Sequence, residues 1–286
     1  MKTRATIIIL ALLFGASALA QNALELTARE VVPGMYALVS ADQQFVGGTM
    51  ALMSGDDGQV LIDGGIAEVT DALLAAIEDM VGDPVDLLIN THVHGDHTGS
   101  NAALHEAGAT IIAHENIRGR LMDDGSPAAA LPTITYDNGV TLYKNGFTLQ
   151  VIHVENAHTD GDSIIYFPDV NVIHAGDVLF NGIFPFIDTA NGGSVDGYLA
   201  AMSKIIAIAD DETQIIAGHG AEIASRADVQ AAQRMITEAR SLVQPLVEAG
   251  LTEDEAVSRD PLAPLSEWNW DFIDADRMTR QMYQSL

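Results

Sequence analysis

Thr91-His92-Val93-His94-Gly95-Asp96-His97 is the stretch of sequence that decides the fold. It holds three histidines and one aspartate within six residues, and it directly follows the apolar run Val85 to Asn90, which predicts a buried strand. Gly95 permits a tight bend that turns Asp96 and His97 toward a second point. Imidazole nitrogen suits zinc, and carboxylate oxygen suits zinc or a harder metal. The stretch therefore predicts a metal site at the end of a strand.

Three further segments supply candidate ligands, and each lies at the end of a predicted strand or in the turn after it. They are Ala157-His158-Thr159-Asp160, Ala175-Gly176-Asp177 and Ala217-Gly218-His219-Gly220. Small residues beside each candidate ligand let the backbone approach a crowded site. We therefore expect His158, Asp177 and His219 to complete the coordination.

The order and spacing of these residues resemble the metallo-β-lactamase superfamily. Its motif is HxHxDH, then a separated His, an Asp or Cys, and a final His, and the resemblance runs from near Met50 to about His219. It implies an α/β fold, a four-layer αβ/βα sandwich in which two mixed sheets pack together with helices outside. It also implies two divalent metal ions. The first would be bound by His92, His94 and His158, the second by Asp96, His97 and His219, and Asp177 would bridge both.

Periodicity indicates the same alternation of strands and helices. Strands are expected at 35–40, 48–54, 59–63, 85–90, 110–113, 148–153, 163–167, 170–174 and 213–217, and helices at 67–80, 100–107, 195–208 and 225–249. Pro245 is expected to kink the last helix or to end it early. Thr252 and Glu255 have the spacing of a capping box for a further short helix. We expect Trp268, Trp270 and Phe272 to anchor the chain end in the core.

The absence of cysteine shapes the expected chemistry, because many true lactamases of this superfamily have Cys where Asp177 stands. A carboxylate is a harder ligand than a thiolate, so manganese or iron are alternatives to the zinc expected first. The superfamily's di-iron redox members have Glu at the position of His94, which weakens an oxidoreductase interpretation. His105, His114, His153 and His174 are expected to be structural, with His153 and His174 as alternative partners that orient the ligands.

The charge of the chain bears on its partners. The formal net charge is −27, from 40 acidic and 13 basic residues. Such a field repels phosphate backbones and anionic membrane surfaces, so nucleic acid is not expected as a partner, whereas a small-molecule substrate is.

The first twenty residues have the pattern of a secretory signal peptide. Lys2 and Arg4 precede the apolar run Thr6 to Phe14, and Ala18-Leu19-Ala20 has small residues where a signal peptidase cleaves. The run is too short to span a bilayer. We expect residues 1–20 to be removed, 21–286 to form one domain, and the mature protein to be periplasmic or secreted without stable membrane association.

These observations predict an exported hydrolase. Because β-lactams are met in the periplasm, the first hypothesis is a β-lactamase-like enzyme that opens the amide by attack of a metal-bound hydroxide, with Asp96 as catalytic residue. A periplasmic lactonase or thioester hydrolase is the alternative, and a non-catalytic metal-binding accessory protein is the alternative from another class. The loops 41–48 and 181–193 are expected to contact the substrate, with Phe45 and Asn191 as candidate contacts. No Lys soon follows Asp177, where several lactamases use one to hold the substrate carboxylate.

Overall fold

The apolar runs of the first half of the chain form a seven-stranded mixed sheet. The computed structural model describes residues 26–40 and 46–286. The first four strands are antiparallel to their neighbours, and the last four are parallel. In sheet order they are β1 (Leu26–Val32), β2 (Met35–Ser40), β3 (Met50–Met53), β4 (Gln59–Ile62), β5 (Val85–Ile89), β6 (Thr110–His114) and β7 (Ile134–Tyr136).

The second half of the chain forms a six-stranded mixed sheet and a short two-stranded one. The six strands, in sheet order, are β15 (Ile223–Ala224), β13 (Gln214–Ile216), β11 (Val172–His174), β10 (Ser163–Phe167), β9 (Phe147–His153) and β8 (Gly139–Lys144). The two-stranded sheet pairs β12 (Phe180–Asn181) with β14 (His219–Gly220) in parallel. This pair brings residue 219 beside the segment that follows Asp177.

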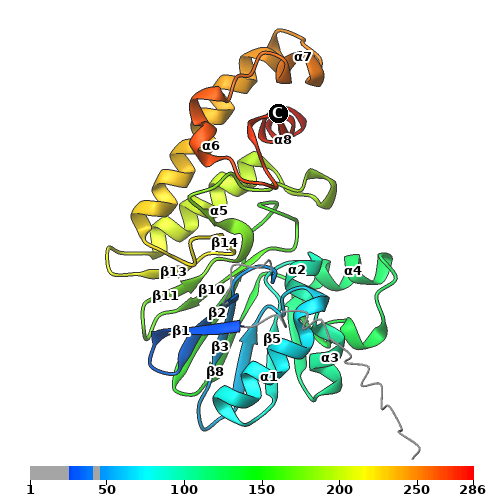
Figure 1. Ribbon diagram of the computed structural model, residues 1–286, viewed down its shortest axis with the longest axis vertical. Coiled ribbons are helices and arrows are strands. Elements are labelled where there is room, and N and C mark those ends of the chain that lie inside the picture. The colour runs from blue at the N-terminus through cyan, green and yellow to red at the C-terminus, as the bar shows by residue number, and fades with distance from the viewer. Residues whose placement is uncertain (1–25, 41–45) are drawn as a thin grey trace, which may run out of the picture.

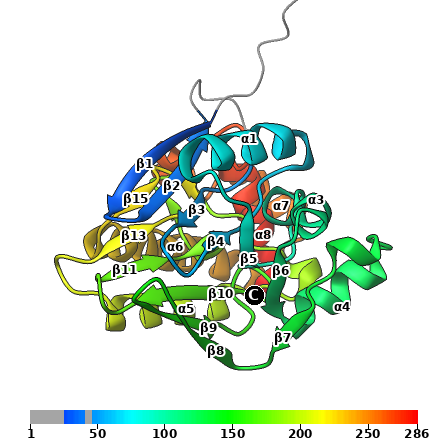
Figure 2. The ribbon, with the colours of Figure 1, turned by 90° about the horizontal axis from the view of Figure 1, so that it is seen from below.

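Helices cover the outer face of each sheet, and Figures 1 and 2 show the resulting layers. The first half contributes α1 (Thr70–Val81), α2 (Gly95–Thr98), α3 (Asn101–Glu106) and α4 (Glu115–Asp123). The second half contributes α5 (Val195–Ile208), α6 (Arg226–Glu248), α7 (Glu253–Val257) and α8 (Ala275–Ser285). Short 3-10 turns lie at η1 (Ala67–Val69), η2 (Ala128–Ala130), η3 (Gly176–Val178), η4 (Thr189–Asn191) and η5 (Ala263–Trp268).

The core lies in three layers that follow from this arrangement. Between the sheets, side chains such as Ile62 and Ile89 pack against Val151 and Ile165 of the opposite sheet. A second cluster joins the first sheet to α1 and α3, and a third joins the second sheet to α5, α6 and α8. Burial of apolar surface on both faces of each sheet explains the near-continuous apolar strands. The expected four-layer α/β architecture is confirmed.

Most of the predicted elements are present, with several corrections. The helix at 195–208 and the strands at 35–40 and 163–167 have the predicted bounds. Pro245 does not end α6, which continues to Glu248. The capping box of α7 is formed by Thr252 and Glu255. The sequence analysis missed β1, β7, β8, α4 and α8.

The proposed signal peptide lies outside the described residues. Within 26–40 and 46–286, we find no helix whose length and apolarity would let it cross a bilayer.

Candidate metal centre

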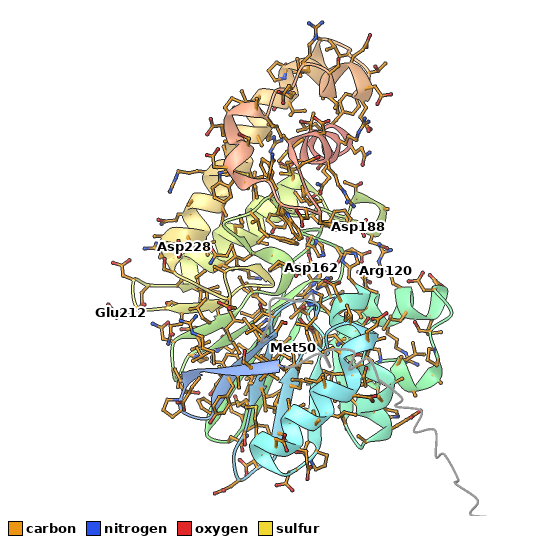
Figure 3. The ribbon with its side chains drawn as sticks, viewed as in Figure 1. Met50, Arg120, Asp162, Asp188, Glu212 and Asp228 are labelled. Carbon is orange, nitrogen blue, oxygen red and sulfur yellow. The ribbon has the colours of Figure 1, made fainter. Side chains whose placement is uncertain are left out.

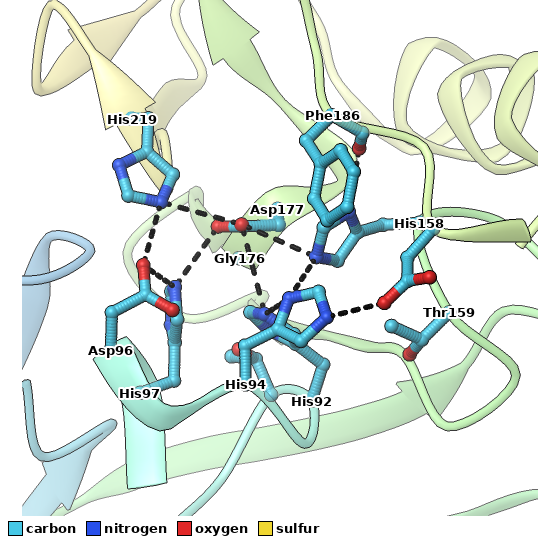
Figure 4. Close-up of polar contacts among 12 residues, drawn as sticks. His92, His94, Asp96, His97, His158, Thr159, Gly176, Asp177, Phe186 and His219 are labelled. Atoms are coloured by element: carbon cyan, nitrogen blue, oxygen red, sulfur yellow. Dashed lines mark hydrogen bonds and ion pairs between the residues drawn. The ribbon is translucent and has the colours of Figure 1, made fainter. Parts of the chain in front are cut away.

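The seven predicted ligands meet at one end of the two sheets (Figure 4). His92 follows β5, His94 is the residue before α2, and Asp96 and His97 lie on α2. The other three come from the second half of the chain: His158 from the loop between β9 and β10, Asp177 from η3 after β11, and His219 from β14 after β13. Both sheets therefore contribute ligands, and the site lies where their strand ends converge.

One group of side chains surrounds the Nδ1 atom of His94. This atom lies 3.2 Å from Nε2 of His92 and 2.8 Å from Nε2 of His158. The Oδ2 atom of Asp177 lies 3.7 Å from Nε2 of His92 and 3.4 Å from Nε2 of His158. Three imidazole nitrogens and one carboxylate oxygen thus point at a common centre, in the donor set that zinc accepts.

A second group surrounds the Nε2 atom of His219. This atom lies 3.2 Å from Oδ2 of Asp96 and 3.3 Å from Oδ2 of Asp177. The Nε2 atom of His97 lies 3.5 Å from Oδ2 of Asp96 and 3.2 Å from Oδ1 of Asp177. Asp177 therefore faces both groups, which is the position expected of a bridging carboxylate.

Two buried atoms of this site test whether a cation fits it. Nε2 of His97 and Oδ1 of Asp177 are buried and lie 3.2 Å apart, but neither has a partner of hydrogen-bonding geometry in the part of the chain that the structure describes. A buried polar atom without a partner costs about 1–3 kcal/mol. A cation between these groups would satisfy both atoms, so the residues present fit divalent metal ions.

Burial and charge set the protonation of the ligands in opposite directions. Burial lowers the pKa of His158 to about 4, although the Asp177 carboxylate opposes it. Burial also lowers the pKa of His219, but the carboxylates of Asp177 and Asp96 outweigh it and raise this pKa to about 9. The surrounding imidazoles, led by His219 and His97, hold the pKa of Asp177 well below its usual range despite burial. The carboxylates thus favour the protonated form of His219, whereas burial favours the neutral form of His158.

Hydrogen bonds at the outer nitrogens orient the imidazoles. Nδ1 of His158 donates to the backbone oxygen of Phe186 at 2.7 Å. Nδ1 of His97 donates to Oδ2 of Asp63 at 2.8 Å, and the same carboxylate accepts the backbone N–H and the hydroxyl of Thr91. Asp63 is fully buried, and the sequence analysis did not assign it a role. The sequence signal for such a role was the position of Asp63 directly after strand β4 and before Gly64-Gly65.

Asp188 orients His94 and was also missed. Its Oδ2 accepts from Nε2 of His94 at 2.8 Å, which leaves Nδ1 of His94 free to face the centre. Asn191 donates from Nδ2 to the same oxygen at 2.6 Å and accepts from Nη1 of Arg120 at 2.7 Å. Arg120, whose label lies near that of Asp188 in Figure 3, also forms a two-pronged ion pair with Asp160. Asn191 was predicted to contact substrate, and its side-chain amide forms hydrogen bonds with Asp188 and Arg120.

The remaining histidines have structural hydrogen bonds, as expected. Nε2 of His174 donates to the backbone oxygen of Thr49 at 3.0 Å, and its Nδ1 accepts the N–H of Gly176. His153 bonds to the backbone oxygen of Asp162, and His105 to that of Ala109. His114 stacks on His153 with 3.8 Å between the ring centroids.

A cavity of about 1000 Å³ opens onto this centre. Its floor includes His94, Asp96, Asp177 and His219, and most of its wall is apolar. Such a volume accommodates a small organic substrate. The wall includes Val46, Gly47, Ile183 and Phe186 from the two loops expected to contact substrate, together with Trp270 and Phe272 from the C-terminal segment.

Trp270 and Phe272 were expected to anchor the chain end in the core, and the structure changes this expectation for both. Trp270 packs against the core, but it also lines the cavity, and Phe272 lines the cavity with 46% of its surface exposed. The prediction that Phe272 is a core anchor was therefore wrong. Phe45 lies outside the described residues.

Gly48 lies directly against the metal centre. A Cβ atom at this position would overlap the imidazole ring of His97. The backbone N–H of Gly48 donates to the backbone oxygen of Asp96 at 3.1 Å, and that of Thr49 donates to Gly218 at 2.8 Å. The close approach of this backbone fixes the position of the His97 ring on one side.

Comparisons with known proteins agree with this geometry. Residues 44–219 match the family model described as the metallo-beta-lactamase superfamily. Among solved structures, a metallo-beta-lactamase from Pontibacter korlensis is similar, with a TM-score of 0.65 and 18% sequence identity. The likeness covers 74% of this chain and 99% of that one, and at this identity it supports the fold alone.

Curated relatives match about half of the chain. A hydroxyacylglutathione hydrolase from Polaromonas sp. is 30% identical over 141 residues, which are 46% of this chain and 47% of the relative. One from Nitrosococcus oceani is 29% identical over 134 residues, with the same coverage. The alpha subunit of 2,4-dinitroanisole O-demethylase from Nocardioides sp. is 31% identical over 104 residues, 35% of this chain and 30% of that one. The chain thus spans about half the length of the first two relatives.

Proposed function

The chain belongs to the metallo-beta-lactamase superfamily, and from this premise we propose that it is a metal-dependent hydrolase of a thioester or a related acyl bond. One observation carries the proposal. Seven side chains from four separate segments converge at the floor of a cavity that is large enough for a small organic molecule. The two hydroxyacylglutathione hydrolases among the relatives support a thioester as the bond that is cleaved.

The residues of the site would bind the metals as the sequence predicts. His92, His94 and His158 would hold one ion, Asp96, His97 and His219 the other, and Asp177 both. Zinc is the expected metal, with manganese or iron as alternatives, because the ligands are nitrogen and oxygen atoms. Two such ions supply Lewis acidity and lower the pKa of a water molecule toward neutrality.

The chain's own residues would position the reactants. Asp96 borders the cavity with 22% of its side chain exposed, and although burial opposes it, His97 and His219 hold its pKa well below the usual range, so its ionised carboxylate would accept a hydrogen bond from the attacking water and orient it. Phe186 stacks on the ring of His94 with 5.7 Å between centroids, and Phe180 stacks on His219 at 4.9 Å. Each phenyl ring thus packs against one face of its imidazole. Hydrolysis of a thioester with water yields a carboxylic acid and a thiol.

A β-lactam is the second candidate substrate, and the signal-peptide pattern of residues 1–20 favours it. The same pattern leads us to propose export to the periplasm or the medium. Asp177 in place of Cys, and the lack of a nearby Lys after it, weigh against a lactam.

The test combines metal analysis with a substrate panel on one preparation. We expect two metal ions per chain and turnover of S-acyl thioesters above that of penicillin, cephalosporin, carbapenem and lactone substrates. His158→Ala should lower turnover roughly a hundredfold or more, because it removes a ligand of the centre. His105→Ala is the matched control, since His105 lies on α3 and its side chain bonds to the backbone oxygen of Ala109 and not to any of the seven ligands. Two bound metals without turnover of any substrate would instead favour a non-catalytic metal-binding protein.

A further inference from the structure

Above the metal ligands, the described wall of the cavity carries no lysine or arginine. None of its described lining residues is lysine or arginine, and residues 41–45, which precede Val46 in the sequence, contain neither. The wall does include two acidic residues that are not metal ligands, Glu222 and Asp271. A carboxylate that entered this cavity would find no cationic side chain on the wall to pair with it.

Two arginines, Arg29 and Arg277, contact residues of the cavity wall, and each already has a partner there. Arg29 faces Glu222 with 3.7 Å between Nη1 and Oε2, but 58% of the Arg29 side chain is exposed, so solvent weakens this pair and Glu222 keeps most of its negative field. The guanidinium of Arg277 lies over the ring of Phe272, 3.9 Å from its centroid, and Nη1 donates to the backbone oxygen of Phe272 at 2.9 Å. Arg29 and Arg277 thus contact groups of the wall, but neither arginine is among the described residues that line the cavity.

Two aromatic side chains give the wall a fixed apolar surface. Trp270 donates from Nε1 to the backbone oxygen of Phe184 at 2.9 Å, and its backbone N–H donates to Ile273 at 3.0 Å. Phe272 packs against both Trp270 and Phe186, with centroids 5.6 and 5.7 Å apart. Trp270 and Phe272 lie beyond the residues that match the family model, which end at 219. This part of the wall is therefore a feature of the chain's own C-terminal segment.

Resting on the proposed hydrolase function, we propose that the substrate places an uncharged, apolar acyl group against Trp270 and Phe272, and that Asp271 and Glu222 disfavour substrates with a carboxylate. An aliphatic or aromatic acyl group would bury apolar surface on the two rings. An anionic group would lose hydration without gaining a partner, and it would lie near two like charges. Thioesters whose acyl chain ends in a carboxylate would then be poor substrates.

The test compares two thioesters that differ only at the end of the acyl chain. Hexanoyl-N-acetylcysteamine is neutral, and adipoyl-N-acetylcysteamine has the same chain length with a terminal carboxylate. For the zinc-loaded protein, we expect kcat/KM to be at least about tenfold higher for the hexanoyl compound. Calorimetric binding of the corresponding uncleavable thioethers should give the same preference without turnover.

Variants of the wall identify the residues responsible. Asp271→Asn together with Glu222→Gln should narrow the hexanoyl-to-adipoyl ratio about two- to fivefold, because it removes two like charges. Trp270→Ala should lower kcat/KM for the hexanoyl compound about tenfold, and less for the acetyl compound, which is too short to reach the ring. Glu267→Gln is the control, since Glu267 is exposed and does not line the cavity, and it should leave the ratio unchanged.

The outcomes separate this inference from the proposed function. Equal use of both thioesters, or preference for the adipoyl compound, would overturn the inference and leave the hydrolase intact. Absence of turnover with preferential binding of the neutral thioether would refute the hydrolase proposal and support the selectivity of the cavity. Equal binding of both thioethers without turnover would refute both.

Discussion

At the level of single residues, the metal centre depends on side chains that do not themselves face it. Asp63 and Asp188 each accept a hydrogen bond from the outer nitrogen of an imidazole, at 2.8 Å in both cases. Each thereby fixes which nitrogen of the ring keeps its lone pair toward the centre. The affinity for metal should therefore depend on these two carboxylates as well as on the seven ligands.

Asp188→Asn tests this dependence. The amide keeps the size of the side chain but loses the charge that holds His94, so we expect zinc to bind about 10- to 100-fold more weakly. Competition with a chromophoric chelator gives the dissociation constant. Asp196→Asn is the matched control, because Asp196 is exposed, pairs with Arg240 and lies outside the hydrogen-bond chain that reaches His94. Equal weakening in both variants would assign the effect to loss of surface charge.

The ligands could be predicted from the sequence, whereas their supports could not. Four of the ligands lie within the six residues 92–97, and Gly and Ala beside the other three mark the crowded positions. Asp63 meets His97 from 34 residues away, and Asp188 meets His94 from 94 residues away. Such contacts depend on how distant parts of the chain pack together, and local sequence patterns do not predict that packing.

At the level of elements, strands and helices buried on one side were predictable and edge elements were not. β5 and α5 have strong apolar patterns. β1 is a mostly exposed edge strand, and β8 alternates between exposed and half-buried residues at the edge of its sheet. The Asn145-Gly146 turn between β8 and β9, with φ values of 54° and 78°, was the unused signal for this hairpin.

Helix α5 supports the centre through one buried hydrogen bond. Tyr198 donates its hydroxyl to the backbone oxygen of Asp177 at 2.9 Å and is fully buried. Tyr198→Phe would leave that oxygen without this partner, so we expect the free energy of unfolding to fall by about 1–2 kcal/mol. Urea denaturation measures it. Tyr143→Phe, at a side chain 76% exposed, should change it by less than about 0.5 kcal/mol. A similar loss in both variants would argue against a specific role for the Tyr198 bond.

At the level of the whole molecule, the centre joins the two halves of the chain. Four ligands come from the first half and three from the second, so metal binding should stabilise the packing of the two sheets. At a free metal concentration of 100 times the dissociation constant, this linkage contributes about 2.7 kcal/mol.

Removal of metal should therefore lower the melting temperature. For a chain of this size we expect a drop of roughly 5–10 °C on adding a chelator to the zinc-loaded protein. Differential scanning calorimetry measures it, and re-addition of zinc should restore the original value. His158→Ala should show a smaller drop, since it binds metal more weakly from the start. A melting temperature that changes with neither chelator nor zinc would show that the seven predicted ligands do not bind metal.

The overall architecture was predicted through the resemblance and not through periodicity. Alternating apolar runs indicate two sets of strands with outer helices, but they do not specify which strands are neighbours. The order β15-β13-β11-β10-β9-β8 places β13 (Gln214–Ile216) in parallel beside β11 (Val172–His174), from which the whole of α5 separates it in the sequence. The family motif supplied that information, because its ligands converge only if the sheets pack in one way.

The surroundings of the cavity differ in the amino-acid substitutions that they tolerate, and the contact between Gly48 and His97 marks the least tolerant position. No side chain larger than hydrogen fits at position 48 unless the imidazole shifts. Positions 270–272, by contrast, border the same cavity from a segment that carries none of the ligands. A mutagenesis library aimed at new substrates would keep the glycine and randomise these three positions. Recruitment of the scaffold to other chemistry, in the laboratory or in nature, would follow the same division.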